Sequence, residues 1–416
     1  MNVIKIYEHE RLEIHANGTP LISSSELDLL DKVNKKHGVK FILSGRKYIK
    51  ATNYVGFIRV KNKTFQVVPK IFKHNQTNVD FLFYLLKYTN KLKIHHFDSG
   101  NLKTRKNDIL EILISWYASE LLQQIKKGIY KSYVLIRENS SFLRGKLIMN
   151  QQFKYNTVEN GKYFCEYEEF TENNIMNQCF LYVSELLLAC TRNRKNKGML
   201  LEIVRFLGNV DRVVVTTKDI LKIPVNRLNK QYKSLLDFCA LVIDNSSIEN
   251  SMYPKIETFT FMFDMNRLFE EFVYVFIHKH ADKLDLELVQ KQFFLGKLFN
   301  KINMYCDLYL KNNDNKELLI DTKYKLANEK GYSQSDFYQM FSYLLGSKKK
   351  SNKIVLLYPV ESIHESFVHN LDPNNALTIH ARGISVSDIW DEDKKKIYDE
   401  KLLGIIKEII YDCLET

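Results

Sequence analysis

Hydrophobic and polar positions in the N-terminal part of the chain follow first the period of strands and then the period of helices. The runs YVGFIRV (54–60) and TFQVVPK (64–70) are rich in β-branched and aromatic residues, and the polar tripeptide KNK between them predicts a β-hairpin. Pro69 has no amide donor, so we expect it at the end of its strand or at a sheet edge. Apolar residues then recur at helical spacing over 78–92 and 107–127.

The middle of the chain is mainly helical in pattern. A β-like section over 133–149 comes first, and Thr171 is a plausible N-cap for the helix that follows. The predicted helices are 172–191, 197–208 and 227–243. The stretch DNSSIENSMYP (244–254) is the most loop-like segment between periodic stretches, which predicts a domain boundary there.

From residue 258 onward the predicted elements come in the order α-β-β-β-α-β. The last strand is apolar throughout, as expected for a strand at the centre of a sheet covered on both faces. The first helix has Asp264 as its predicted N-cap, and the second ends at Gly346. The elements are 265–280, 286–294, 303–310, 317–323, 333–346 and 353–360. Such an order predicts a C-terminal domain with a core of its own.

Composition favours, but does not decide, a polyanionic partner. The chain has 61 Lys and Arg against 49 Asp and Glu, a net charge of +12. A positive field of this kind attracts DNA. The base composition of an AT-rich genome would also enrich Lys, so the charge alone leaves both explanations open.

The cysteines and the N-terminus predict a cytoplasmic protein without membrane segments. Six cysteines occur without a CxxC pair or zinc-finger spacing, which is typical of small buried residues in a reducing compartment. The start MNVIKIYEHERLEIH lacks the apolar core of a signal peptide. No uncharged stretch approaches the roughly 18 residues that a membrane-spanning helix requires.

Two acids and a lysine in the third and fourth of these C-terminal elements carry the chemistry. Asp307 interrupts a strand-like apolar run, and Asp321-Thr322-Lys323 ends the next one. Carboxylates on adjacent strands can converge on one Mg²⁺, and the backbone carbonyl of Thr322 can supply a further oxygen. Because side chains alternate along a strand, Lys323 lies on the same face as Asp321, where it can orient a water or stabilise a phosphorane-like state. The alternative is a purely structural Asp–Lys pair.

The segment 258–360 resembles the PD-(D/E)xK nuclease fold. Asp307 corresponds to the first acid and residues 321–323 to the (D/E)xK triplet, while Cys306 replaces the usual proline. Gln339, with Tyr343 one turn later, is similar to the motif that lies near the metal and DNA in the RecB-like branch. The alternative for Gln339 is a solvent-facing helix residue.

Five signatures follow one another along the chain: YVGFIRVKNKTFQVVPKI (54–71), FLRGKL (142–147), EYEEFTENNIMNQ (166–178), FDMNRLFEEFV (263–273) and IDTKYKLANEKGYSQSDFYQMFSY (320–343). In this order they resemble the signatures of the McrC family, the nuclease subunit of the McrBC modification-dependent restriction system. In that family an acid of the LFE helix can join the active site, which implies Glu270, with its neighbour Glu271 as the alternative.

The resemblance implies a mixed α+β and α/β multidomain protein. We expect a β-rich and helical partner-docking region over 1–150, a helical connecting region over 151–250 and a PD-(D/E)xK endonuclease domain over 251–416. The chain has no P-loop, so a hexameric AAA+ GTPase, McrB, would read modified (methylated cytosine) DNA and translocate. This chain would cut double-stranded DNA with Mg²⁺, and two complexes would meet for a double-strand break. The alternatives are a free-standing RecB-like repair nuclease and a non-catalytic adaptor that only stimulates the motor.

Overall fold

The structure is a computed structural model that describes residues 3–16, 19–70, 78–89, 108–157, 161–249, 255–298, 301–325, 333–346, 353–360, 367–372, 377–385 and 392–415. Predicted positions outside these ranges are 71, 90–92, 107, 250–254 and 326–332. The chain divides into two compact units, one made of Met1–Ile109 with Thr260–Thr416 and the other of Leu110–Phe259. The units do not follow the expected boundaries at 150 and 250, and the division by role stays a prediction.

The N-terminal part of the first unit contains the predicted hairpin. Strands β7 (Tyr54–Val60) and β8 (Lys63–Val68) pair antiparallel, and β8 ends just before Pro69, as predicted. Strand β1 (Val3–Tyr7) runs parallel to β8, and β13 (Lys255–Asp264) follows β7 in the sheet.

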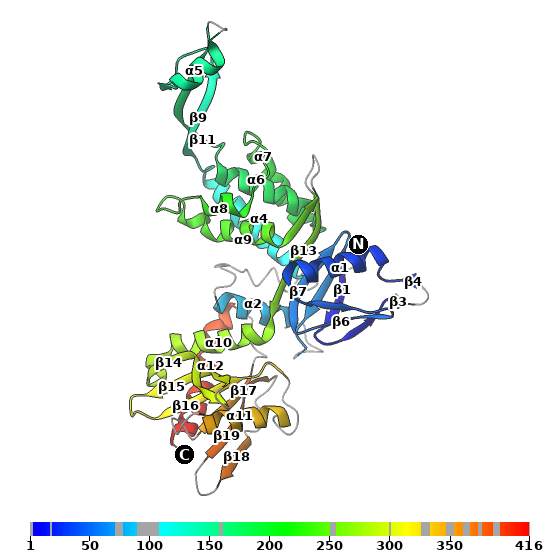
Figure 1. Ribbon diagram of the computed structural model, residues 1–416, viewed down its shortest axis with the longest axis vertical. Coiled ribbons are helices and arrows are strands. Elements are labelled where there is room, and N and C mark those ends of the chain that lie inside the picture. The colour runs from blue at the N-terminus through cyan, green and yellow to red at the C-terminus, as the bar shows by residue number, and fades with distance from the viewer. Residues whose placement is uncertain are drawn as a thin grey trace. The chain divides into compact units, whose positions relative to one another are not determined.

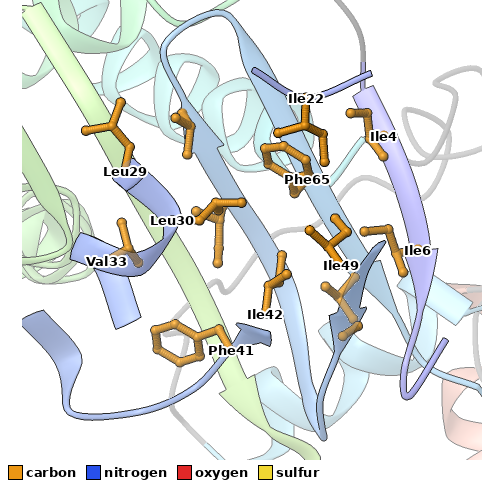
Figure 2. Close-up of a cluster of buried hydrophobic side chains, with 14 of the residues drawn as sticks. Ile4, Ile6, Ile22, Leu29, Leu30, Val33, Phe41, Ile42, Ile49 and Phe65 are labelled. Atoms are coloured by element: carbon orange, nitrogen blue, oxygen red, sulfur yellow. The ribbon is translucent and has the colours of Figure 1, made fainter. Parts of the chain in front are cut away.

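Helix α1 (Ser24–His37) packs against this sheet and closes its core. Ser23 and Glu26 form a capping box at the start of the helix, because each side chain accepts a hydrogen bond from the other residue's backbone amide. Leu29, Leu30 and Val33 belong to one buried cluster with isoleucines of the strands, as Figure 2 shows. The smaller strands here are β2 (Arg11–Glu13), β3 (His15–Ala16), β4 (Thr19–Pro20), β5 (Ile42–Ser44) and β6 (Tyr48–Ala51).

Gly56 marks a close approach between two strands of this sheet. Its φ is +140°, and a Cβ there would lie 1.8 Å from the carbonyl oxygen of Phe261 on β13. Only glycine combines that dihedral with that contact without strain.

The second unit is a set of helices with an extended arm. Its helices are α4 (Ile109–Lys127), α6 (Ile175–Leu188), α7 (Arg194–Phe206), α8 (Thr217–Leu221), η1 (Lys230–Tyr232) and α9 (Lys233–Asp244), followed by strand β12 (Ser246–Glu249). The arm consists of β9 (Ser132–Ser140), β10 (Lys146–Leu147), α5 (Met149–Asn156) and β11 (Tyr163–Thr171), and Figure 1 shows it extending away from the helices.

The predicted N-cap of the helix after the arm is wrong. Thr171 is the last residue of β11, where it pairs with Ser132, and the helix α6 begins only at Ile175. Asn174 caps it instead, because its side chain accepts a hydrogen bond from the Asn177 amide at 3.1 Å.

The C-terminal part of the first unit has the predicted order of elements. Its six-stranded sheet has the order β14-β15-β16-β17-β19-β18. Strand β17 lies between parallel neighbours and is buried along its length, as predicted. The elements are α10 (Met265–Lys279), η2 (Ala281–Leu284), β14 (Leu286–Leu298), β15 (Ile302–Asn312), β16 (Glu317–Thr322), α11 (Gln334–Gly346), β17 (Lys353–Val360), β18 (Phe367–Asp372), β19 (Leu377–Ser385) and α12 (Glu392–Glu415). The last two strands and α12 extend beyond the predicted core.

A helix from the N-terminal region, α2 (Asn78–Tyr88), completes the packing around α10. Tyr84 makes an edge-to-face contact with Phe272 of α10 at 5.4 Å, and its hydroxyl donates to Asp399 of α12 at 2.8 Å. Figure 1 shows α2 beside α10. Residues 251–416 therefore share their core with α2 instead of closing it alone.

None of the described helices has both the length and the apolar composition needed to cross a membrane. All six cysteines lie in described residues and are buried, as the sequence predicts.

Candidate active site

Asp307 and Asp321 come together because β15 and β16 pair antiparallel. Leu308 lies opposite Ile320, and one further step along this register brings Asp307 opposite Asp321. Asp307 lies within its strand, while Asp321 is the penultimate residue of β16. The sheet therefore places the two predicted acids side by side.

Asp321 is a buried carboxylate whose charge is poorly compensated. The residue is 1% exposed, and burial, followed by the nearby charge of Asp307, raises its pKa to about 7. Lys323 opposes this shift, because its Nζ lies 2.6 Å from Asp321 Oδ2. The lysine is thus beside Asp321, as strand alternation predicted.

Thr322 orients Asp307. The backbone amide and the hydroxyl of Thr322 both donate to Asp307 Oδ2, each at 2.7 Å. The sequence suggested only a carbonyl ligand at this position, whereas the structure adds a two-donor clamp on the first acid. A carboxylate held by two donors has a fixed direction, which an active-site ligand requires.

Glu270 reaches the same site from α10. Burial, and secondarily the charge of Asp307, raises the pKa of its carboxyl. Lys291 of β14 lies nearby, with its Nζ 3.6 Å from Glu270 Oε1. Of the two acids that the sequence left open, Glu270 is thus placed beside Asp307.

Sequence reasoning missed Lys291 and its neighbour Gln292. Gln292 has a φ of +49°, which is uncommon for a residue other than glycine, and its side chain interacts with Glu270. Strained backbone of this kind concentrates at functional sites. No motif marks either residue, because only the pairing of β14 with β15, in which Lys291 lies opposite Leu308, brings them there.

Helix α11 brings Gln339 and Tyr343 to the site. Gln339 Nε2 donates to the Tyr343 hydroxyl at 2.6 Å, and this hydrogen bond is partly buried. Burial, and then the charge of Asp321, raises the pKa of Tyr343 to about 12. Gln339 is therefore engaged with Tyr343 close to the acids, and it is not simply a solvent-facing helix residue.

A third ion pair, between Lys325 and Asp336, fixes the start of α11. Lys325 pairs with the buried Asp336, which also accepts a hydrogen bond from the Tyr358 hydroxyl at 3.3 Å. Ser333 caps the helix, since its hydroxyl accepts from the Asp336 amide at 3.3 Å. Burial opposes ionisation of Asp336, but Lys325 and Ser333 outweigh it and lower its pKa. This pair, which the sequence did not reveal, anchors the helix that carries Gln339.

The acids have the chemistry of a magnesium site, although they are not yet gathered around one point. No group of three or more His, Cys, Asp or Glu side chains forms a preassembled metal site among the described residues. In the same described part of the chain, Glu270 Oε1 and Asp321 Oδ2 are buried without a hydrogen bond of normal geometry. Hard carboxylate oxygens with raised pKa values are the donors that a divalent cation would neutralise. The carboxylates of the site therefore fit Mg²⁺ by their chemistry, and their side chains would have to move together to bind it.

Comparison with known proteins assigns the family. The model of the McrBC 5-methylcytosine restriction system component family matches residues 49–371, more than half of the chain. The chain belongs to this family. The resemblance to McrC drawn from the five sequence signatures is thereby confirmed.

Solved structures agree with the fold of this McrBC component, although no curated protein matches it. One is described as "Refined half-complex from tetradecameric assembly of Thermococcus gammatolerans McrB AAA+ hexamers with bound McrC". It has a TM-score of 0.76 at 18% identity and covers 98% of this chain and 100% of the matched chain. A second is described as "Cryo-EM structure of the Thermococcus gammatolerans McrBC complex". It has a TM-score of 0.52 at 24% identity, and the match covers 67% of this chain and 88% of the matched chain. At these identities the likeness shows the fold.

Proposed function

We propose that this chain is the Mg²⁺-dependent DNA endonuclease subunit of a McrBC-type restriction system, acting in the cytoplasm with a PD-(D/E)xK nuclease core. The observation that carries the proposal is the convergence of Asp307, Asp321 and Lys323, with Asp307 clamped by Thr322. Two acids and a lysine at this spacing suit hydrolysis of a phosphodiester.

Each residue has a distinct role in this proposal. Asp307, Asp321 and the Thr322 carbonyl would hold the Mg²⁺, which supplies charge neutralisation at the scissile phosphate. Lys323 orients the attacking water and stabilises charge on the phosphoryl oxygens. Glu270 adds a third carboxylate to the site from α10.

Gln339 and Tyr343 line the site from α11. An amide and a phenol are suited to contact the DNA backbone beside the metal, because both are neutral hydrogen-bonding groups. The net charge of +12 adds a salt-dependent attraction for double-stranded DNA.

The arm of the second unit is our candidate surface for a partner. Its large apolar side chains are exposed, with Tyr133 70%, Phe142 72% and Phe153 65% accessible. Exposed apolar side chains gathered on one projecting element mark an interaction site. The partner in this proposal is a hexameric AAA+ GTPase of the McrB type. It would recognise methylated cytosine and translocate, while the chain stimulates its GTP hydrolysis.

The test compares the wild-type chain with Asp307→Ala and Asp321→Ala in the presence of the motor, GTP and Mg²⁺ on methylated and unmethylated DNA. Both variants should lose cutting while keeping the fold and motor stimulation. The matched control is Asp314→Ala, because Asp314 is an exposed acid in the loop that joins the same two strands. Lys323→Ala should lose cutting but retain metal binding. Normal cleavage by either Asp variant at ordinary Mg²⁺ would refute the site.

The same assay separates the two alternatives. Efficient double-strand cutting by the chain alone, with Mg²⁺ and no nucleotide, would indicate a free-standing RecB-like nuclease. Motor stimulation without cleavage under any condition would indicate a non-catalytic adaptor. The intact Asp307, Asp321 and Lys323 favour the nuclease over the adaptor.

A further inference from the structure

The chain leaves the sheet directly after Lys323, although the side chain of Lys323 has to stay beside Asp321. Lys323 donates its backbone amide to Leu357 of β17 at 2.9 Å, the last step of the ladder, because β16 ends at Thr322. The next backbone bond is local, from the Lys325 amide to the Lys323 carbonyl. The direction of the chain after Lys323 therefore depends on side-chain contacts.

Tyr324 supplies those contacts. It is 5% exposed, and its ring packs on Phe269 of α10 with centroids 6.0 Å apart. Burial, and then the charge of Glu8, which its hydroxyl faces, raises the pKa of Tyr324 well above its ordinary value. Burial likewise raises the pKa of Glu8 to about 7, a shift that Lys70 and Tyr324 offset only in part. Tyr324 thus lies between the helix that carries Glu270 and the N-terminal sheet.

Glu8 is itself fixed by the N-terminal sheet. Its amide donates to the Val68 carbonyl at 3.1 Å, and its Oε2 accepts from the Lys70 amide at 3.0 Å. The carboxylate is 3% exposed. Within the described residues, neither Glu8 Oε1 nor the Tyr324 hydroxyl makes a hydrogen bond of normal geometry. A buried acid and phenol of this kind cost stability compared with an apolar pair, which favours a role in placement over one in stability.

Resting on the proposed function, we infer that Glu8 and Tyr324 are positioning residues that hold Lys323 against Asp321 from the N-terminal sheet. One residue from each of the two sequence segments of the first unit then serves a single purpose. Neither touches the metal or the phosphate. They act through the backbone of Lys323, whose amine must meet the attacking water.

The test uses Tyr324→Phe, which keeps the ring on Phe269 and removes only the hydroxyl. Single-turnover cleavage with the motor, GTP and saturating Mg²⁺ should slow by about tenfold, since misplacement of a catalytic group by less than 1 Å has effects of this size. The Mg²⁺ concentration for half-maximal rate and the thermal midpoint should stay unchanged. Tyr88→Phe is the matched control: Tyr88 is another tyrosine packed on α10, and its hydroxyl is buried with no hydrogen bond in the part of the chain the structure describes.

Two substitutions at Glu8 complete the test. Glu8→Gln keeps an acceptor for the Lys70 amide and a polar group facing Tyr324, so it should cut at nearly the wild-type rate. Glu8→Leu should slow cutting at least as much as Tyr324→Phe does. The double variant Glu8→Leu/Tyr324→Phe should be no slower than Glu8→Leu, because both substitutions remove the same contact between Glu8 and Tyr324.

The outcomes separate this inference from the function on which it rests. An unchanged rate for Tyr324→Phe, or a slower rate that comes with a lowered thermal midpoint or a shifted Mg²⁺ requirement, overturns the positioning role. A wild-type chain that does not cut, under conditions in which it stimulates the motor, overturns the proposed function instead.

Discussion

Replacing Asp321 by asparagine should stabilise the metal-free protein above neutral pH. In the folded state the pKa of Asp321 is about 7, mainly because of burial, against an ordinary value of 3.8. The folded protein therefore holds this proton more tightly than the unfolded chain does. Stability is then lost as the pH rises from about 4 through 7, and the neutral amide of the Asp321→Asn variant removes that loss.

The size of the effect follows from the same values. A difference of about 3 in pKa corresponds to roughly 4 kcal/mol of unfolding free energy at pH 8. The attraction of Lys323, whose Nζ lies 2.6 Å from Asp321 Oδ2, is already contained in this pKa, so the figure is the net effect of losing both the charge and the ion pair. We expect a higher thermal midpoint for Asp321→Asn at pH 8 in EDTA and no difference near pH 4. Adding Mg²⁺ should stabilise the wild type but not the variant.

The control is Asp336→Asn, which should act in the opposite direction. Asp336 is also buried, but Lys325 and Ser333 lower its pKa, so its charged form stabilises the fold above its ordinary titration range and the stability is lost on acidification. The measurement is thermal unfolding of both variants and the wild type between pH 4 and 8. If at pH 8 the thermal midpoint of Asp321→Asn lies as far below that of the wild type as the midpoint of Asp336→Asn does, the reasoning about this site is refuted.

Three further predictions concern the clamp, the sheet and the pairing of complexes. Thr322→Val removes the hydroxyl donor to Asp307 and should slow single-turnover cleavage about tenfold, while Thr322→Ser should not; equal rates would exclude the clamp. Gly56→Ala should destabilise by more than about 4 kcal/mol in urea unfolding, whereas Gly128→Ala, at φ +137° with no described atom within 4 Å, should cost far less. Mixing wild-type chain with Asp321→Ala chain should convert double-strand breaks into nicks on gel analysis, and undiminished breaks would exclude cutting by pairs.

Local patterns explain why much of the C-terminal half was predictable. Strand β17 was predicted with its observed bounds because an apolar run of that length has few alternatives. Asp264 was predicted as the cap of α10, and its side chain accepts from the Asn266 amide at 3.0 Å. Thr171 failed as a cap because β11 continues to that residue, which depends on its pairing with β9.

The sequence by itself determined which residues can carry the chemistry, and only the tertiary structure decided what holds them. Asp307, Asp321 and Lys323 are visible because acids within apolar runs are costly and strand side chains alternate. The clamp of Thr322 on Asp307 and the contact of Glu8 with Tyr324 join residues that no local period relates. Packing also made α2 part of the C-terminal core, because an apolar helix buries its surface against whichever partner the folded chain brings near.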